Sequence, residues 1–315
     1  MGTEFDLIAM IQDGTQVPRA DVSVGMGDDG AVVRVPPSQE LVVALDTMVE
    51  GVHFLPGTAP AALGWKALAV NLSDLAAMGA APAWALLALT LRRADAAFVQ
   101  ELAAGFAQLA REYQVALVGG DTTSGPLSIS VAVHGLVPAG AALLRSGARV
   151  GDVVLVTGTL GDGVAGLYAL RDPPRDTPER AALRRQLVER LERPVPRVAA
   201  GIALRGLASA CIDVSDGLLG DLGHICAASG VGAELDATLL PRSRALLEFA
   251  LTGGDNYELC FTVAPEHLQQ ALTDLGRVGC GVAWIGRIVA GSGVRVRDGH
   301  GGWLTPGTRS WEHFA

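Results

Sequence analysis

The chain has 315 residues and a formal net charge of −9, with 33 Asp and Glu against 24 Lys and Arg. This length suits two domains of about 150 residues each, and the acidic balance argues against nucleic acid or an anionic membrane as the main partner. The longest apolar run, residues 80–91, is too short to cross a bilayer and contains Pro82. The N-terminal stretch carries Glu4 and Asp6 and no basic segment, so it does not resemble a signal peptide.

The first half of the chain alternates predicted helices and strands. Leu68, Leu72 and Leu75 repeat at helical spacing, which predicts an apolar helix over residues 67–79. The other expected elements, in chain order, are a helix at 3–12, strands at 31–35, 41–45 and 84–91, a helix at 95–113, and strands at 115–118 and 127–136.

The composition of the sequence changes around Pro138, Gly140 and Gly147, which predicts a boundary between domains 1–140 and 141–315. The second half contains expected strands at 152–157, 233–235, 259–263 and 282–287. Its expected helices lie after the turn at 158–163 and at 181–192, 197–209, 218–228, 243–251 and 265–275. Residues 171–179 are charged and rich in proline, typical of a surface loop. This alternation predicts an α/β or α+β fold.

Four cysteines show no spacing typical of a zinc site: Cys211, Cys226, Cys260 and Cys280. We interpret them as buried thiols, which are typical of proteins in a reducing compartment. A cytoplasmic location is therefore expected.

Aspartates recur in one kind of setting, beside apolar strands or glycines. They are Asp29, Asp46, Asp74, Asp121, Asp213 and Asp216. One such residue is usually a helix or turn cap, and that alternative stays open for each of them. Asp74 is the only charged side chain in residues 67–91, where an unpaired carboxylate is costly.

If these carboxylates meet where strand ends collect at the edge of a sheet, their mutual repulsion requires cations. Hard divalent ions with oxygen ligands fit, and Mg²⁺ usually combines one or two carboxylates with water and phosphate oxygens. Such a site favours phosphoryl chemistry on a nucleotide.

The familiar nucleotide motifs are absent from the sequence. Lys66 precedes Ala67, which excludes a P-loop. Residues 158–163 read GxxGxG, which favours a strand-to-helix turn over a dinucleotide site. The protein-kinase motifs and a GxSxG elbow are also missing.

Seven segments stand in an order that resembles the thiamine-monophosphate kinase family. They read Gly-Asp-Asp-Gly-Ala at 27–31, Leu-Asp-Thr-Met-Val-Glu-Gly-Val-His-Phe at 45–54, Asn-Leu-Ser-Asp-Leu-Ala-Ala-Met-Gly at 71–79, Gly-Gly-Asp-Thr at 119–122, Arg-Ser-Gly-Ala at 145–148, Asp-Val-Ser-Asp-Gly-Leu at 213–218 and Gly-Gly-Asp-Asn-Tyr-Glu-Leu at 253–259. This family lies within the superfamily of aminoimidazole ribonucleotide (AIR) synthetase and selenophosphate synthetase. The resemblance covers nearly the whole chain.

The resemblance implies an AIR-synthase-like fold of two domains, with the N-terminal sheet pairing across a homodimer and ATP between that half and a larger C-terminal α/β half. It implies several Mg²⁺ ions held by Asp29, Asp46, Asp74, Asp121, Asp213 and Asp216, with Asp74, Asp121 and Asp216 taking part in catalysis. The implied ATP contacts are Gly120, Asp121, Arg145 and Ser215. The implied thiamine phosphate contacts are His53, Glu258 and Trp311. An arginine fork suits phosphate, and an indole face suits a cationic thiazolium ring.

The implied activity is ATP-dependent phosphorylation of thiamine monophosphate to thiamine diphosphate by direct in-line transfer, with ATP and thiamine monophosphate as small-molecule partners. Two alternatives stay open: another ATP-using enzyme of the superfamily, or a non-catalytic protein that binds nucleotide and Mg²⁺. Two departures leave the number of bound metals open. Ala44 and Leu45 stand where the family usually has Ser/Thr-Thr, and Asn256 replaces the second Asp of the Gly-Gly-Asp-Asp-Tyr-Glu turn.

Overall fold

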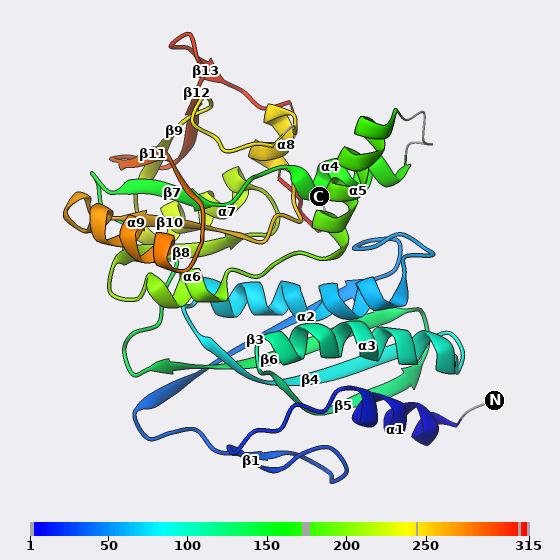
Figure 1. The fold of residues 1–315 in the computed structure, drawn as a ribbon. Helices are drawn as coiled ribbons and strands as arrows, with labels where there is room; N and C mark the ends of the chain where they lie inside the picture. The colour runs from blue at the N-terminus through cyan, green and yellow to red at the C-terminus, as the bar shows by residue number, and fades with distance from the viewer. Residues whose placement is uncertain (1–2, 172–176, 244, 308–309, 314–315) are drawn as a thin grey trace. The chain divides into compact units, whose positions relative to one another are not determined.

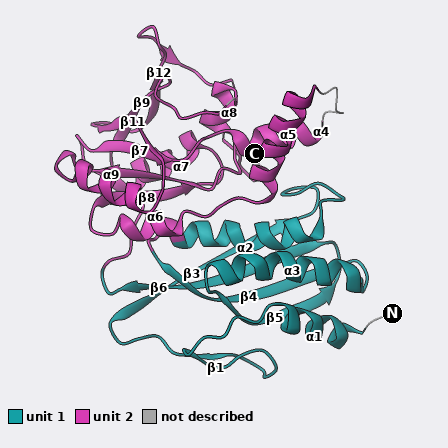
Figure 2. Cartoon of the chain, in the orientation of Figure 1, with its two compact units in different colours: residues 1–75, 80–140 teal, residues 76–79, 141–315 magenta. Residues whose placement is uncertain are grey.

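A computed structural model describes residues 3–171, 177–243, 245–307 and 310–313 (Figure 1). The chain divides into two compact units, residues 1–75 with 80–140 and residues 76–79 with 141–315 (Figure 2). Both units mix helices and strands, which confirms the predicted fold class. Within the described ranges, none of the helices combines the length and the apolar character that a membrane span requires. Most of the predicted surface loop at 171–179 lies outside the described residues.

Unit 1 is a four-stranded sheet with helices on one face (Figure 1). Its strand order is β3 (Gln39–Val49), β6 (Ser128–Pro138), β4 (Ala81–Leu91) and β5 (Ala116–Ser124), with β4 and β5 parallel and the other neighbours antiparallel. The helices are α1 (Glu4–Gly14), α2 (Pro60–Ala77) and α3 (Ala96–Glu112). A separate ribbon pairs β1 (Val22–Val24) with β2 (Val32–Val33).

Two glycines bring α2 and α3 into direct backbone contact. A Cβ atom at Gly64 would overlap the carbonyl oxygen of Leu102, and one at Gly105 would overlap that of Ala61. Since close-packed interiors have no room for an added methyl group at such a crossing, these two positions fix the separation of the helices.

The sheet of unit 1 has an open face, which we define by Leu41, Val43 and Leu45 of β3 and Leu86 of β4. Val43 and Leu45 are 58% and 63% exposed. The opposite face carries buried side chains such as Leu87, Val131 and Val133 toward the helices. Part of the sheet near Trp84 and Val118 is covered by residues of the β1–β2 ribbon. The uncovered remainder is an apolar surface of the kind that proteins usually bury.

Unit 2 is built on a seven-stranded sheet, mostly antiparallel. Its order is β13 (Trp303–Leu304), β12 (Gly293–Arg297), β9 (Gly232–Asp236), β11 (Val282–Val289), β7 (Val153–Thr157), β10 (Glu258–Val263) and β8 (Ala208–Val214), with β12 and β9 parallel. The helices are α4 (Asp162–Arg171), α5 (Pro178–Glu192), α6 (Val198–Ala203), α7 (Leu218–Ser229), α8 (Leu247–Thr252) and α9 (Leu268–Arg277), with a 3-10 turn at Pro265–His267. Leu218, Leu222 and Ile225 of α7 are fully buried in the core of this unit.

Several predicted boundaries are wrong. The helix expected at 197–209 is the short α6, because the chain turns at Gly206, whose φ is 73°, and enters β8. The strand expected at 31–35 is only β2, and the helix expected at 243–251 is α8. Strands β12 and β13 were not predicted. Cys211, Cys226 and Cys260 are buried thiols as predicted, whereas Cys280 is partly exposed between α9 and β11.

Candidate functional site

Asp46 and Asp74 lie at one junction between β3 and α2. The backbone N–H of Asp46 donates to Oδ1 of Asn71 at 2.9 Å, and Nδ2 of Asn71 donates to the carbonyl of Ala67 at 2.9 Å. Asp74 follows Asn71 by three residues, so it lies on the same side of the helix. Asp46 is exposed and Asp74 is half-buried. The bond to Asn71 thus joins the strand of Asp46 to the part of α2 that carries Asp74, through an asparagine to which the sequence analysis assigned no role.

Asp121 lies on the other face of the same sheet and at its other edge. Asp46 pairs across the four strands with Val131, Leu87 and Gly120. Asp121 belongs to the next set of paired residues along the strands, with Thr47, Ser130 and Ala88. Because successive side chains of a strand point to opposite faces, Asp121 faces the open side. Within unit 1 the fold therefore separates Asp121 from Asp46 and Asp74. The carboxyl ends of β3 and β5 lie at the same end of the sheet, because both strands run in the same direction, but Asp46 and Asp121 point to opposite faces from opposite edge strands.

The remaining predicted residues of unit 1 lie in turns or at tight backbone contacts. Asp29 is exposed between β1 and β2, and its N–H donates to Oδ1 of Asp28 at 2.8 Å. His53 is half-buried after β3, and its Nδ1 accepts the N–H of Val49 at 3.0 Å. In the neutral ring this contact leaves the proton on Nε2. At Gly120, a Cβ atom would overlap the carbonyl oxygen of Leu87.

In unit 2, a turn after β8 brings Ser215, Asp216 and Trp311 together. The carbonyl of Ser215 accepts the N–H of Asp255 at 2.9 Å, and the carbonyl of Asp216 accepts the N–H of Trp311 at 3.0 Å. Asp213 is buried at the end of β8, while Asp216 is exposed beyond it. This turn therefore joins two predicted metal ligands, a predicted ATP contact and a predicted substrate contact.

A pocket of about 630 Å³ opens at this turn. Its lining is Asp216, Leu219, Gly220, His224, Thr252, Pro306, Ser310, Trp311, Glu312 and His313. The indole of Trp311 meets the ring of His313 edge to face at 5.8 Å. The hydroxyl of Ser310 accepts the N–H of Gly220 at 3.0 Å, which holds the C-terminal segment on the first turn of α7.

Asp221 is a buried carboxylate that the sequence analysis missed. It is 3% exposed, and its Oδ2 accepts the N–H of Asp216 at 3.2 Å and that of Gly217 at 3.0 Å. Burial, followed by the negative charge of Asp213, raises its pKa from 3.8 to about 7. An acidic residue between Leu218 and Leu222, on the apolar side of a predicted helix, was the available signal.

Glu258 is the shared acceptor of a buried ion-pair network. It is 1% exposed. The Nε and Nη2 of Arg197 donate to its two oxygens at 2.6 Å each, Nη2 of Arg190 donates at 2.8 Å, and the hydroxyl of Thr157 donates at 2.6 Å. Such a two-pronged arginine contact is geometrically specific. Two guanidinium groups against one carboxylate leave the cluster with an excess positive charge, and neither arginine was predicted.

Arg145 is exposed on the segment between β6 and β7, which runs beside β8. The carbonyl of its neighbour Leu144 accepts the N–H of Cys211 at 2.8 Å, and the carbonyl of Arg145 accepts from the hydroxyl of Ser229 at 3.4 Å. These contacts hold the backbone and leave the guanidinium at the surface.

The two departures from the family pattern have structural explanations. Asn256 is buried, its Oδ1 accepts the N–H of Gly161 at 2.7 Å, and its Nδ2 donates to the carbonyl of Gly253 at 2.7 Å. The amide therefore joins two turns by donating and accepting at once, which an ionised Asp cannot do. Leu45 points to the open face, away from Asp46. Of the two preceding positions, only Ala44 shares the face of Asp46.

The donor groups fit Mg²⁺ rather than a metal with three or more protein ligands. Among the described residues, no three His, Cys, Asp or Glu side chains are grouped so that they would hold a metal ion. Asp46 lies on the strand that Asn71 joins to α2, the helix of Asp74, and Asp213 and Asp216 both lie near Asp221. Mg²⁺ is usually held by one or two carboxylates and keeps its other positions for water and phosphate. Burial is the main cause of the raised pKa of Asp221, and the negative charges of Asp213 and Asp216 add to it; a cation would relieve the part that these charges contribute.

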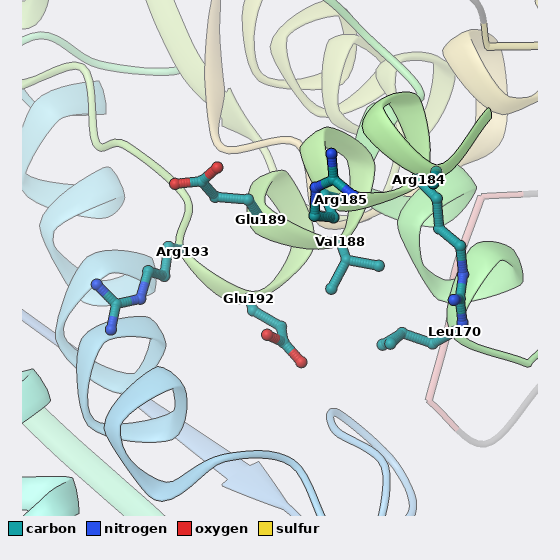
Figure 3. A pocket seen from close by; sticks show the side chains of 8 residues that line it. Leu170, Arg184, Arg185, Val188, Glu189, Glu192 and Arg193 are labelled. Atoms are coloured by element: carbon teal, nitrogen blue, oxygen red, sulfur yellow. The ribbon is translucent and has the colours of Figure 1, made fainter. Parts of the chain in front are cut away.

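A second pocket, of about 610 Å³, lies along α5 and contains none of the predicted site residues (Figure 3). Its charged lining residues are Arg184, Arg185, Glu189, Glu192 and Arg193. In Figure 3 the arginine side chains leave the helix in different directions. Nε of Arg184 donates to the carbonyl of Ala169 at 2.8 Å, which fastens α5 to α4. This pocket has no convergent set of donors.

Comparisons with known proteins identify the family. The family described as AIR synthase related protein, N-terminal domain, matches residues 27–137, and its C-terminal counterpart matches residues 149–299. The thiamine-monophosphate kinase of Salmonella typhimurium is 47% identical over an alignment of length 327, which covers 99% of this chain and 98% of that protein. The chain belongs to the thiamine-monophosphate kinase family. The Escherichia coli K12 member of this family is also 47% identical, over 324 residues.

Solved structures of the family agree with this fold. The thiamine-monophosphate kinase of Stenotrophomonas maltophilia K279a has a TM-score of 0.85 and 44% identity, covering 93% of this chain and 96% of that one. AaThiL, solved in complex with AMPPCP and TMP, has a TM-score of 0.78 and 33% identity, covering 99% and 97%. The predicted AIR-synthase-like architecture of two domains is thereby confirmed.

Proposed function

We propose that this protein transfers the γ-phosphoryl group of ATP to the phosphate of thiamine monophosphate, giving thiamine diphosphate and ADP. The observation that carries this proposal is 47% identity along 99% of the chain to a thiamine-monophosphate kinase. A relative of 33% identity whose structure holds AMPPCP and TMP supports both substrates. The reaction joins two polyanions, so the protein must neutralise charge and align the reacting groups.

We assign the metal ligands to Asp29, Asp46, Asp74, Asp121, Asp213 and Asp216. When bound, Mg²⁺ screens the phosphate charges and orients the phosphoryl group for in-line displacement. The fold holds these ligands in position. Asn71 binds the backbone at Asp46, and the turn after β8 presents Asp216 beside Trp311. The acceptor phosphate is already ionised near neutral pH, so no protein base is required.

The nucleotide contacts in this proposal are Gly120, Asp121, Arg145 and Ser215, and the residues that line the thiamine phosphate site are His53, Glu258 and Trp311. The exposed indole of Trp311 offers a flat face to the cationic ring. Glu258 is saturated by Arg190 and Arg197, so we assign it the task of orienting these arginines toward the substrate.

We infer that the enzyme is a cytoplasmic homodimer in which the open face of unit 1 is the contact between copies. The apolar side chains at Leu41, Val43, Leu45 and Leu86 support this contact. The place of Asp121 on the same face supports it further, because a partner copy would bring other groups to a carboxylate that unit 1 holds apart. Free thiols in the described chain suit a reducing compartment.

The test is transfer of label from ATP carrying ³²P in its γ-phosphate. With Mg²⁺ and thiamine monophosphate, we expect the label in the terminal phosphate of thiamine diphosphate. Formylglycinamidine ribonucleotide, tested in parallel, separates this enzyme from a ring-forming member of the superfamily. Calorimetric binding of ATP without any labelled diphosphate would instead indicate a non-catalytic protein and overturn the proposal.

A further inference from the structure

We propose that Asp221 is a positioning residue for phosphoryl transfer, holding in place the turn that presents Asp216 to the substrates. The inference rests on the proposed kinase function, and it assigns a role to a carboxylate outside the predicted ligand set. Its basis is the pair of hydrogen bonds that Oδ2 of Asp221 accepts from the backbone of Asp216 and Gly217.

The start of α7 explains why such a group is needed. A helix leaves its first N–H groups without partners, and the residue before the helix usually satisfies one of them with its side chain. Here that residue is Gly217, which has no side chain and adopts a φ of 131°. A Cβ atom at Gly217 would lie 2.7 Å from the backbone of Thr252 and 3.0 Å from Oγ of Ser310. Both the backbone conformation and the space therefore require glycine.

Asp221 stabilises this turn from inside the helix. It lies one turn after Gly217 and reaches back to two successive N–H groups, where an ordinary cap would reach forward. The turn that carries Asp216 is thus held by a side chain that cannot itself reach solvent.

Asp216 is fixed on both sides of its α-carbon. Its N–H donates to Asp221, and its carbonyl accepts from the N–H of Trp311. The backbone of Asp216, a predicted metal ligand, is therefore tied to Trp311, which lines the pocket at this turn. A loss of the first contact should disturb the metal dependence of the reaction and the binding of thiamine monophosphate together.

Stability alone does not account for a carboxylate at this position. Asp221 is buried beside Asp213 and close to Asp216, where a third negative charge is unfavourable. An asparagine would offer an acceptor oxygen without that charge. The geometry points to a role in the working site, where outer groups that orient metal ligands typically contribute about 10- to 100-fold in affinity or activity.

The test compares Asp221→Ala, which removes the acceptor oxygen, with Asp162→Ala in the full-length protein. Asp162 is a matched control, because it also lies in the first turn of a helix of unit 2, is 5% exposed, and accepts bonds from the hydroxyls of Thr159 and Ser243 at 2.6 Å each. For Asp221→Ala we expect kcat to fall about tenfold or more and the Mg²⁺ concentration for half-maximal rate to rise several-fold. Asp162→Ala should leave both within about twofold.

The outcomes separate the two proposals. An active wild type beside an Asp221→Ala variant with unchanged kcat and Mg²⁺ dependence overturns the positioning role alone. A wild type that forms no thiamine diphosphate overturns the kinase function and this role with it. Hydrogen exchange of the wild-type amides at 216 and 217 tests the geometry even if the variant fails to fold. Slow exchange is expected, and exchange as fast as in an open loop contradicts the contact.

Discussion

At the scale of single residues, Trp311 and Asp221 reach Asp216 from opposite sides. One binds its carbonyl and offers an indole to the pocket, and the other binds its N–H from the buried start of α7. Binding of the substrate therefore depends on Trp311, and the position of the Asp216 carboxylate depends on Asp221, although both act on the same backbone turn. Each side chain can be tested by its own substitution.

Replacing Trp311 by alanine should raise KM for thiamine monophosphate about tenfold and leave KM for ATP nearly unchanged, because contact of a cation with an indole is worth roughly 0.5–2 kcal/mol. Steady-state kinetics with each substrate varied in turn measure the two constants. Trp303→Ala is the control, since Trp303 is also exposed in unit 2 but stacks with Arg295 and Arg297. An unchanged KM for thiamine monophosphate in Trp311→Ala would remove this residue from the site.

The raised pKa of Asp221 predicts a pH-dependent stability of the metal-free protein. Its folded pKa of about 7 exceeds its ordinary value of 3.8, so between these values the folded state keeps a proton that the unfolded state has released. Stability is then highest below pH about 4, falls as pH rises toward 7, and levels off above it, by up to roughly 4 kcal/mol.

Urea unfolding with EDTA at pH 5 and pH 8 measures this effect in the wild type and in Asp221→Asn. The variant should lose most of the pH dependence and be the more stable protein at pH 8. Equal pH dependence in the two proteins would show that another group is responsible.

At the scale of helices and strands, Gly105 controls how closely α3 approaches α2. Gly105→Ala should lower the free energy of unfolding by about 1–3 kcal/mol or more, because the added methyl group meets the carbonyl of Ala61 and forces the helices apart. Denaturant unfolding measures the change. Gly223→Ala in α7 is the control: a Cβ atom there meets no atom within 4 Å, so the better helix propensity of alanine should raise stability by about 1 kcal/mol. A Gly105→Ala protein as stable as wild type would contradict the close crossing.

The same elements show what sequence patterns could and could not predict. The apolar spacing of α2 and α7 is local, and both helices were found. Strands β3 and β5 were predicted to end at Leu45 and Val118, where their apolar runs give way to Asp-Thr and to Gly-Gly-Asp. In the folded sheet β3 pairs with β6 over its full length, and β5 pairs with β4 beyond Asp121. Partners distant in the chain decided these boundaries.

Sequence patterns likewise predicted some residues of the candidate site and missed others. The Asp-Val-Ser-Asp-Gly-Leu motif located the turn at Ser215 and Asp216, since all its parts are adjacent in the chain. Asn71 acts through a hydrogen bond to the backbone of Asp46, 25 residues away, which only the folded chain brings near. Asp221 bonds to groups four and five residues before it, and only its burial in the core of unit 2 depends on distant partners. The face on which Asp121 lies depends on the register of four strands, which no local pattern specifies.

At the scale of the whole molecule, the open face of unit 1 predicts self-association. Sedimentation should give a mass of about twice 32.4 kDa for the wild type. Val43→Glu places a charge in the proposed contact and should shift the protein to monomer. Val278→Glu is the control, because Val278 is also exposed but follows α9 in unit 2. A monomeric wild type, or a Val43→Glu protein that stays dimeric, would contradict this contact.

The most direct test of the kinase assignment is the rate of thiamine diphosphate formation by Asp74→Asn, measured with ATP, thiamine monophosphate and saturating Mg²⁺. Asp95→Asn is the control, because Asp95 caps α3 in the same unit by accepting the N–H of Phe98 at 3.2 Å. If carboxylate-bound Mg²⁺ aligns the two phosphates, Asp74→Asn should retain less than about a tenth of the wild-type rate, with Asp95→Asn near wild type. An Asp74→Asn enzyme that keeps more than this fraction would contradict the central role given to its carboxylate.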